Sequence, residues 1–247
     1  MRLVRPRSQS ELGVPDSTWQ NVDLLILALE ASMEIRVSAK VFAEFVTGGP
    51  GKKSSTVRNI LRPRSPEARI PSGYYRRAIG IIREYHDRGN DSSFVLRELR
   101  SLHSDAELAN TAQARAKRNS NLLAVESYMR SFSGRGWKVT KCPRVYYSSG
   151  EVRISGTPDL AIQDGDRLRL IKLGVRKEKE TQDMVRVMLR VIYQAAKAKL
   201  KVTTRDVTYF DVRTGEALSG EPSDNHLANT IEGGCRALEQ MIHVKAA

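Results

Sequence analysis

The sequence predicts a protein of mixed α and β structure, α+β or α/β, in which a helical half is followed by a mixed sheet flanked by helices. Residues 21–132 carry mainly helical periodicity of apolar side chains. Residues 152–173 contain short apolar, strand-like runs, and the Asp-Gly-Asp turn at 164–166 joins two of them as a hairpin. A further helix expected over 178–200 and a strand over 207–212 complete the second half.

Length and composition restrict the class of protein. The 247 residues, 40% of them hydrophobic, are enough for one large or two modest domains. No apolar run approaches the ~20 residues that span a bilayer, and the basic start lacks the apolar stretch of a secretory signal. Cys142 and Cys235 match no metal-ligand spacing and are expected to be free thiols. We therefore expect a cytoplasmic protein with no membrane partner.

Positive charge is the clearest functional feature of the composition. The formal net charge is +13, and residues 51–118 alone hold 15 Lys and Arg against 7 Asp and Glu. Such a block attracts polyanions, and the release of counterions from DNA then supplies affinity. Double-stranded DNA is the expected partner, with a solvated arginine-rich surface as the alternative reading.

The first helices resemble a helix-turn-helix. Helices are expected over 21–33, over 39–46 with Ser38 as the cap, and over 56–62, with glycines at 48, 49 and 51 between the last two. In that motif the third helix enters the major groove with its first turn at the bases. The turn here is longer than is usual for the motif. An ordinary helical bundle with a glycine-rich surface loop is the alternative.

Residues around the third helix supply the predicted DNA contacts. Arg58 can bind guanine through two hydrogen bonds and Asn59 can bind adenine. Phosphate contacts are expected from basic residues and from hydroxyls at the helix start. These phosphate-contacting residues are Lys52, Lys53, Ser55, Thr56, Arg62 and Arg64.

A helix over 72–88 begins near Tyr74-Tyr75-Arg76-Arg77. Aromatic residues beside arginines suit nucleic-acid contact, although tyrosines at a helix start also serve as packing groups. Arg76 and Arg77 are therefore further candidates for DNA binding.

A long helical run over 105–132 is expected to join two domains. Ser104 and Glu107 have the spacing of a capping box at its start. Its first half is polar and its second half amphipathic, with Glu126 among apolar neighbours. The expected division is a helical DNA-binding domain over 1–103, a helical linker over 104–118, and a sheet domain over 119–247.

The sheet domain resembles the PD-(D/E)XK nuclease superfamily over roughly residues 119–220. Gly156-Thr157-Pro158-Asp159-Leu160 matches the Pro-Asp strand of that family, and Ile171-Lys172-Leu173-Gly174 matches the end of its acid-x-Lys strand. The resemblance implies a helix carrying a Glu, then the hairpin, then a helix and a further strand. It also implies that Glu126, Asp159 and Lys172 are the catalytic residues, if the site is active.

The acid of the triplet is missing. If Lys172 is the family's lysine, the acid position is Leu170; if the spacing from Asp159 is followed, Lys172 occupies the acid position and Gly174 the lysine position. A hydrolytic site needs Mg²⁺ held by carboxylate oxygens, and Asp159 alone holds it poorly. Glu126, Glu151 or Glu178 could supply the second carboxylate, with Glu126 the best placed of the three.

Three functions remain open. The first is a sequence-specific double-stranded DNA-binding protein, a transcriptional regulator or repressor of a bacterium, phage or mobile element, with an inactive nuclease-like domain, no metal or other cofactor, and self-association as a homodimer left open. The second is an active Mg²⁺-dependent endonuclease that binds the metal through Glu126 and Asp159. The third is an assembly protein that binds nucleic acid without sequence preference.

Overall fold

A computed structural model describes residues 34–62, 74–174, 180–212, 214–221 and 225–246. The chain divides into two compact units, Met1–Glu34 and Ile35–Ala247, and the description below concerns the second. The helix expected over 21–33 lies outside the described residues. The expected α+β class, with helices before the main sheet, is confirmed.

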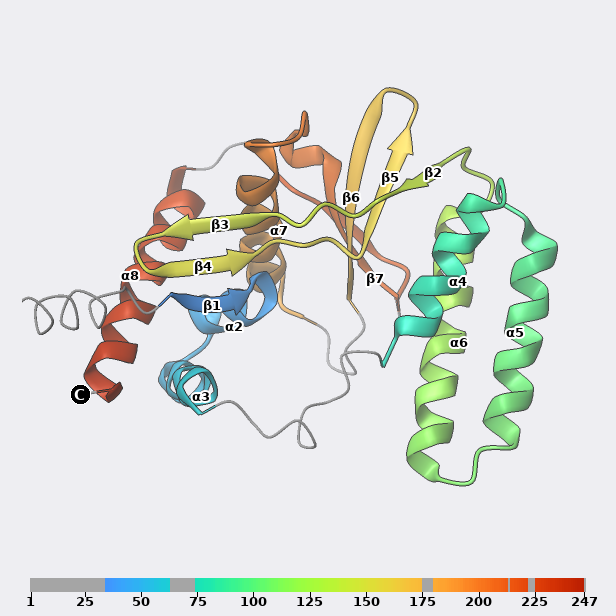
Figure 1. The fold of residues 1–247 in the computed structure, drawn as a ribbon, viewed down its shortest axis with the longest axis horizontal. Helices are drawn as coiled ribbons and strands as arrows, with labels where there is room; N and C mark the ends of the chain where they lie inside the picture. The colour runs from blue at the N-terminus through green and yellow to red at the C-terminus, as the bar shows by residue number, and fades with distance from the viewer. Residues whose placement is uncertain (1–33, 63–73, 175–179, 213, 222–224, 247) are drawn as a thin grey trace, which may run out of the picture. The chain divides into compact units, whose positions relative to one another are not determined.

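Helices make up most of the described chain (Figure 1). The α-helices are α2 (Ala39–Thr47), α3 (Pro50–Leu61), α4 (Arg76–Asp87), α5 (Ser92–Glu107), α6 (Ala112–Phe132), α7 (Gln182–Lys197) and α8 (Asn225–Ala246), and a short 3-10 helix, η2, spans Thr204–Asp206. The strands are β1 (Ile35–Ser38), β2 (Lys138–Thr140), β3 (Tyr146–Ser149), β4 (Val152–Ser155), β5 (Leu160–Asp164), β6 (Arg167–Gly174), β7 (Val207–Asp211) and β8 (Ala217–Ser219).

The larger sheet has five strands in the order β2-β5-β6-β7-β8. The predicted hairpin is confirmed as the antiparallel pair β5–β6, in which Leu160 lies opposite Ile171. β6 and β7 pair in parallel through the crossover helix α7. Alternating residues of these strands face two separate cores, because successive side chains of a strand point to opposite faces. One core contains α4, α5 and α6, and the other contains α2, α7 and α8.

The smaller sheet has three strands in the order β1-β4-β3. Its inner side chains, which include Ile35 and Ile154, pack in the core formed with α2, α7 and α8. β1 pairs in parallel with β4 and was not predicted. β3 pairs antiparallel with β4, so residues 146–149 belong to this smaller sheet and not to the sheet of the β5–β6 hairpin.

α2 and α3 follow each other closely in the chain, and both contact α8. Ser38 caps α2 as predicted, accepting a hydrogen bond from the backbone N of Val41 at 3.2 Å. α3 begins at Pro50, six residues before the expected start, because proline fits the first position of a helix. The turn between α2 and α3 therefore contains only Gly48 and Gly49.

The single helix expected over 105–132 is wrong. The chain breaks at 108–111 between α5 and α6, which form a pair of adjacent helices (Figure 1). Asp91 caps α5 and Thr111 caps α6. Ser104 and Glu107 lie in the last turn of α5, so they are not the predicted capping box.

The division of the chain also differs from the expected boundaries of 1–103, 104–118 and 119–247. Residues 35–61 are joined to the sheets through β1 and through contacts of α2 with α7 and of α3 with α8. The unit of Ile35–Ala247 therefore includes both the α2–α3 pair and the sheets. Among the described helices, none has the length and apolar character to cross a bilayer.

Candidate functional site

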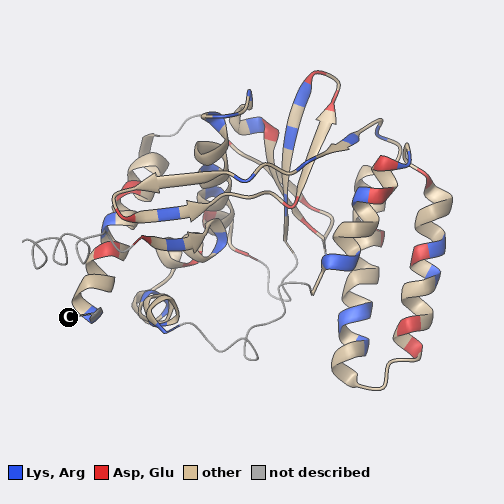
Figure 2. Cartoon of the chain, in the orientation of Figure 1, with Lys and Arg blue, Asp and Glu red and all other residues tan. Residues whose placement is uncertain are grey.

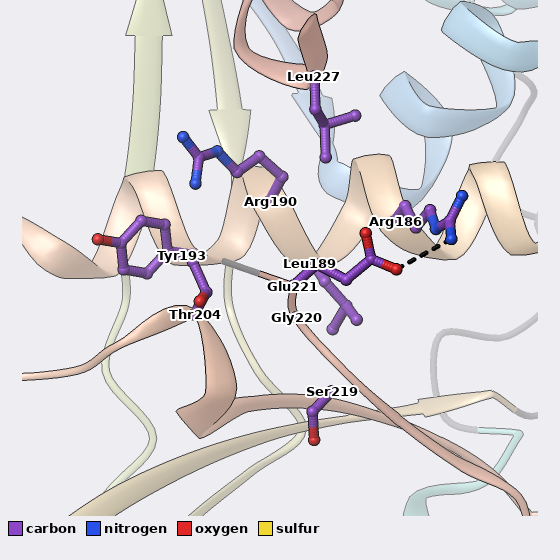
Figure 3. Close-up of a pocket in the computed structure, with 9 residues that line it drawn as sticks. All are labelled: Arg186, Leu189, Arg190, Tyr193, Thr204, Ser219, Gly220, Glu221 and Leu227. Carbon is purple, nitrogen blue, oxygen red and sulfur yellow. Dashed lines mark hydrogen bonds and ion pairs between the residues drawn. The ribbon is translucent and has the colours of Figure 1, made fainter. Parts of the chain in front are cut away.

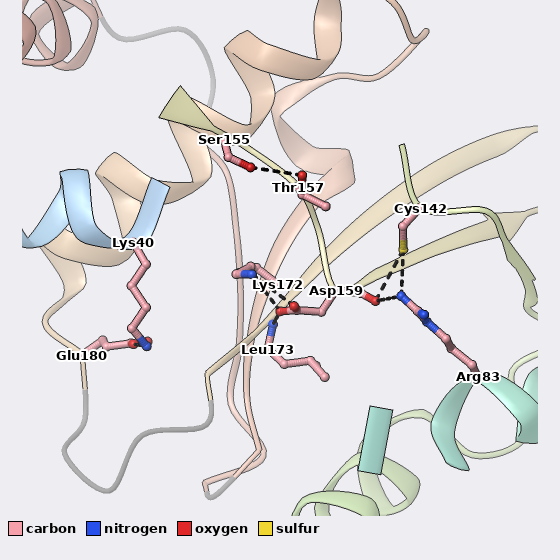
Figure 4. Close-up of polar contacts among 9 residues, drawn as sticks. All are labelled: Lys40, Arg83, Cys142, Ser155, Thr157, Asp159, Lys172, Leu173 and Glu180. Atoms are coloured by element: carbon pink, nitrogen blue, oxygen red, sulfur yellow. Dashed lines mark hydrogen bonds and ion pairs between the residues drawn. The ribbon is translucent and has the colours of Figure 1, made fainter. Parts of the chain in front are cut away.

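Asp159 and Lys172 meet at the start of β5. The backbone N of Asp159 donates to the carbonyl of Ile171 at 2.9 Å, which sets the aspartate opposite Lys172. Lys172 Nζ lies 3.1 Å from both carboxylate oxygens of Asp159. The backbone N of Leu173 also donates to Oδ2 at 2.9 Å (Figure 4). Both oxygens of the carboxylate are thus engaged by donors of β6.

The alternation of side chains explains this pairing. Leu160, Ile171 and Leu173 belong to the core that contains α6. Asp159 and Lys172 alternate with them and so point to the opposite side of the sheet. There the two side chains keep 23% and 22% of their surface exposed. The ammonium of Lys172 occupies the place beside Asp159 that a bound cation would take.

Neither alternative placement of the triplet finds its second residue: Leu170 stands at the acid position of one, and Gly174 at the lysine position of the other. Leu170 is fully buried in the core. A Cβ on Gly174 would overlap the hydroxyl of Tyr209, so the arrangement leaves no space for a side chain there. The register that places Asp159 opposite Lys172 corresponds to the alternative in which lysine stands at the acid position.

The structure does not join Glu126 to this pair. Glu126 is half-buried on α6, which packs on the face of the sheet opposite to Asp159 and Lys172. Within the described ranges, no three His, Cys, Asp or Glu side chains are grouped as metal ligands. Glu151 instead pairs with His243 of α8 at 2.9 Å. Glu178 lies outside the described residues.

Arg83 of α4 is a site residue that the sequence did not reveal. Its Nη2 donates to the backbone carbonyl of Asp159 at 2.7 Å and contacts Cys142 Sγ at 3.3 Å (Figure 4). Burial raises the pKa of the Cys142 thiol, although the Arg83 guanidinium opposes this. The sequence signal for this contact is the position of Arg83 directly after the apolar pair Ile81-Ile82, from which its side chain reaches the sheet.

Two hollows lie on either side of Tyr74 and Arg76. The first has a volume of about 440 Å³, and the second about 460 Å³. The first is lined by Tyr74, Tyr75, Arg76, Ile79, Gly80, Arg83, Pro158 and Asp159. The second is lined by Tyr74, Arg76, Arg77, Leu102, Ala114, Lys117, Arg118 and Asn121.

The two predicted DNA-binding arginines of α4 differ in their surroundings. Arg76 is exposed and borders both hollows. Arg77 forms ion pairs with Asp105 and Glu98 of α5. Both arginines are exposed and border the second hollow, Arg76 also borders the first, and the ion pairs of Arg77 tie α4 to α5.

α3 presents most of the other predicted residues on its outer side. The exposed members of the predicted set are Lys52, Ser55, Arg58, Asn59 and Arg62. The sequence of α3 contains no Asp or Glu, so this side is uniformly basic and polar (Figure 2).

The remaining predicted residues of this set lie elsewhere. Thr56 is buried at 7% exposure beside Val57, on the packed side of the helix, which does not suit a phosphate contact. Lys53 is half-buried, with its ammonium 5.7 Å from the centre of the Phe45 ring. Arg64 lies outside the described residues.

A small cavity beside α7 has no room for a ligand. Its volume is about 20 Å³, comparable to the space of a single water molecule. Arg186 and Glu221 form an ion pair of 2.9 Å at its edge (Figure 3). The site residues lie away from it, on β5, β6, α3 and α4.

No family model matches the chain, and no curated protein matches it either.

Proposed function

We propose that the protein is a sequence-specific double-stranded DNA-binding protein, a transcriptional regulator of repressor type, with a nuclease-like sheet that does not cut. The observation that carries the proposal is the outer side of α3, where two arginines, a lysine, an asparagine and a serine are exposed together. A bacterium, phage or mobile element is the proposed setting, and the cytoplasm the proposed compartment. A homodimer would present two copies of α3 to a two-fold operator.

The packing of α3 against its neighbouring helices supports this proposal. Val57 is fully buried, and α3 packs against both α2 and α8. A reading helix must be held rigidly if its side chains are to distinguish bases. Arg58 and Asn59 have the donors and acceptors that read guanine and adenine in the major groove. Lys52 and Arg62, one near each end of the helix, suit contacts to phosphates.

Selection from random duplexes followed by binding measurements tests the proposal. We expect an enriched motif, and Arg58→Ala should weaken binding by about 1–3 kcal/mol at one base position only. Lys52→Ala should weaken binding to all sequences alike and lower the salt slope by about 1. Arg97→Ala, which removes an exposed arginine from α5, is the matched control. The absence of any enriched motif would favour the third function, nucleic-acid binding without sequence preference.

The sheet supports the second half of the proposal. The order α6, β2, β5, β6, α7, β7 is the order that the PD-(D/E)XK resemblance implies, with β3 and β4 inserted. The lysine that engages both oxygens of Asp159 and the buried Leu170 argue against a second metal-binding carboxylate, and the closed position at Gly174 argues against a lysine there. We infer that this domain kept an architecture suited to DNA without a cleavage site.

One observation favours the alternative of an active endonuclease. Asp159 and Lys172 are in contact, as a catalytic pair would be. Incubation of supercoiled plasmid with Mg²⁺ or Mn²⁺, beside an Asp159→Ala variant and a Glu126→Ala variant, separates the two functions. Cleavage that both variants lose would establish the enzyme with Glu126 as the second acid. We expect no cleavage by any of the three proteins.

A further inference from the structure

The outer face of the three-stranded sheet is polar and basic. Alternate residues of β1, β4 and β3 point away from the core, because their neighbours Val37, Val152 and Ile154 are buried on the inner face. The outward side chains are Arg36, Ser38, Tyr146, Ser148, Arg153 and Ser155. Figure 1 shows the three strands side by side.

The register brings two arginines together on this face. Arg36 of β1 lies directly opposite Arg153 of β4. Arg36 is exposed and Arg153 half-buried, so this face places two guanidinium groups side by side at the surface. An arginine pair of this kind suits a phosphate, since each planar fork can donate two hydrogen bonds.

An aromatic ring completes the face. Tyr146 is 41% exposed, and the Arg153 guanidinium lies 4.2 Å from the centre of its ring. Tyr146 lies opposite Ser155, next to the arginine row. Arg36, Val37, Tyr146, Arg153 and Ser155 line a hollow of about 260 Å³. The hollow therefore contains two cations, a hydroxyl and a stacking surface.

We propose that this face binds an unpaired nucleic-acid strand. A phosphodiester group lies between Arg36 and Arg153, and a base stacks on the layer formed by Tyr146 and Arg153. Unpaired strands are bound on exposed sheet faces by this combination of a basic surface with aromatic or guanidinium planes. A base in a duplex is already stacked on its neighbours, so its face is not available to stack on Tyr146. The site is separate from α3 and does not depend on duplex binding there.

Fluorescence anisotropy with a labelled mixed-sequence strand tests the proposal. A strand of about 16 nucleotides is long enough for the site sizes of single-strand-binding modules. The same sequence annealed to its complement is the comparison ligand. The full chain is used unchanged, as three variants of the sheet face and as one control variant of α5. The variants are Tyr146→Ser, Tyr146→Phe and the double substitution Arg36→Gln/Arg153→Gln.

The three variants have distinct expected results. Tyr146→Ser should weaken single-strand binding roughly 5- to 150-fold, and Tyr146→Phe should stay within about 2-fold, because the ring provides the stacking. The double arginine variant should bind about 10-fold or more weakly and lower the salt slope by about 0.7, for the loss of one neutralised phosphate. Binding of the duplex should change little in the two tyrosine variants.

A matched control separates this site from general charge. Arg97→Gln/Arg100→Gln removes two exposed arginines from α5 and leaves the sheet untouched. If this control weakens single-strand binding as much as the sheet variant, the face is not a specific site. The proposal is also overturned if the unchanged protein does not bind the single strand, or if Tyr146→Ser weakens duplex and single strand equally. Unchanged far-UV circular dichroism and melting temperature of each variant establish that the fold is intact.

Discussion

Lys172→Glu should convert the Asp159 site into one that binds a divalent cation. In the unchanged protein, Lys172 Nζ lies 3.1 Å from both carboxylate oxygens of Asp159 and supplies the positive charge beside them. The substitution replaces the ammonium by a second carboxylate directly opposite the first. Mg²⁺ sites commonly use one or two carboxylates together with water, and Mn²⁺ takes the same oxygen ligands. Lys172→Met is the matched control, because it removes the charge and adds no ligand.

The geometry sets the expected size of the effect without metal. The pair is about three-quarters buried, so losing its charged hydrogen bonds should cost about 1–2 kcal/mol in either variant. In Lys172→Glu, repulsion between carboxylates about 5 Å apart adds about 3 kcal/mol at an effective dielectric constant of about 20. We therefore expect the free energy of unfolding to fall by about 4–5 kcal/mol in Lys172→Glu and by much less in Lys172→Met.

Metal should then reverse most of this loss in one variant only. At a Mn²⁺ concentration 100 times the dissociation constant, binding stabilises the folded state by about 2.7 kcal/mol, or about 5–11 °C in melting temperature for a chain of this size. Thermal melts of the unchanged protein and both variants, with and without MnCl₂, measure this directly. If Mn²⁺ stabilises the unchanged protein as much as Lys172→Glu, Asp159 already shares a metal with another carboxylate. That result would refute the role given to Lys172.

Two further predictions concern packing and pH. Gly234→Ala should destabilise the fold by about 1–3 kcal/mol, because the new Cβ would lie 2.5 Å from Val46 Cγ2. Gly233→Ala has open space around its new Cβ and should stabilise α8 by up to about 1 kcal/mol. Urea unfolding of the two variants measures both effects, and equal effects would contradict the close approach of α2 and α8. Burial lowers the pKa of His86, although its hydrogen bond with Asn90 opposes this, so the neutral ring favours the folded state. The stability that this group contributes is present above about pH 6.5 and is lost as the pH falls below it. In urea titrations between about pH 7.5 and 5.5, His86→Gln should therefore reduce the fall in the free energy of unfolding with pH. An unchanged fall would assign it to other groups.

The parts of the fold that the sequence predicted are determined by short local motifs. The Asp-Gly-Asp turn and the alternating residues after it fixed the β5–β6 hairpin, and with it the meeting of Asp159 and Lys172. Ser38 fixed the start of α2. In each case the signal lies within a few residues of the feature that it determines. Such signals do not depend on the rest of the chain.

The features of the fold that the sequence did not predict depend on residues far apart in the chain, or on residues whose local signal is ambiguous. β1 is four residues long and is defined by pairing with β4, more than a hundred positions away. The break between α5 and α6 falls in Leu-Ala-Asn-Thr, where neither glycine nor proline marks it. Pro50 lies among the glycines expected to separate the two helices, whereas it opens α3. The contact of Arg83 with Asp159 joins two elements whose proximity only the tertiary fold determines.

The pairing of β1 with β4 has a consequence for dissecting the protein. A fragment of residues 104–247 would lose β1, α2, α3, α4 and most of α5. With them go Phe42, Phe45 and Val57, all nearly fully buried in the core against α7 and α8, and Ile82 and Tyr85 of the core that contains α6. Removing one buried phenylalanine side chain already costs about 3–5 kcal/mol, and a domain of this kind has only about 5–15 kcal/mol in total.

We therefore expect fragment 104–247 to lack a cooperative urea transition, and fragment 35–247 to retain one. Cooperative unfolding of 104–247 with the midpoint of the longer fragment would instead support an independent sheet domain beginning near residue 104. If the expected result holds, the side of α3 that we propose to bind duplex DNA and the sheet face around Arg153 belong to one cooperative unit. Their roles then have to be separated by surface substitutions such as Arg58→Ala and Tyr146→Ser rather than by truncation.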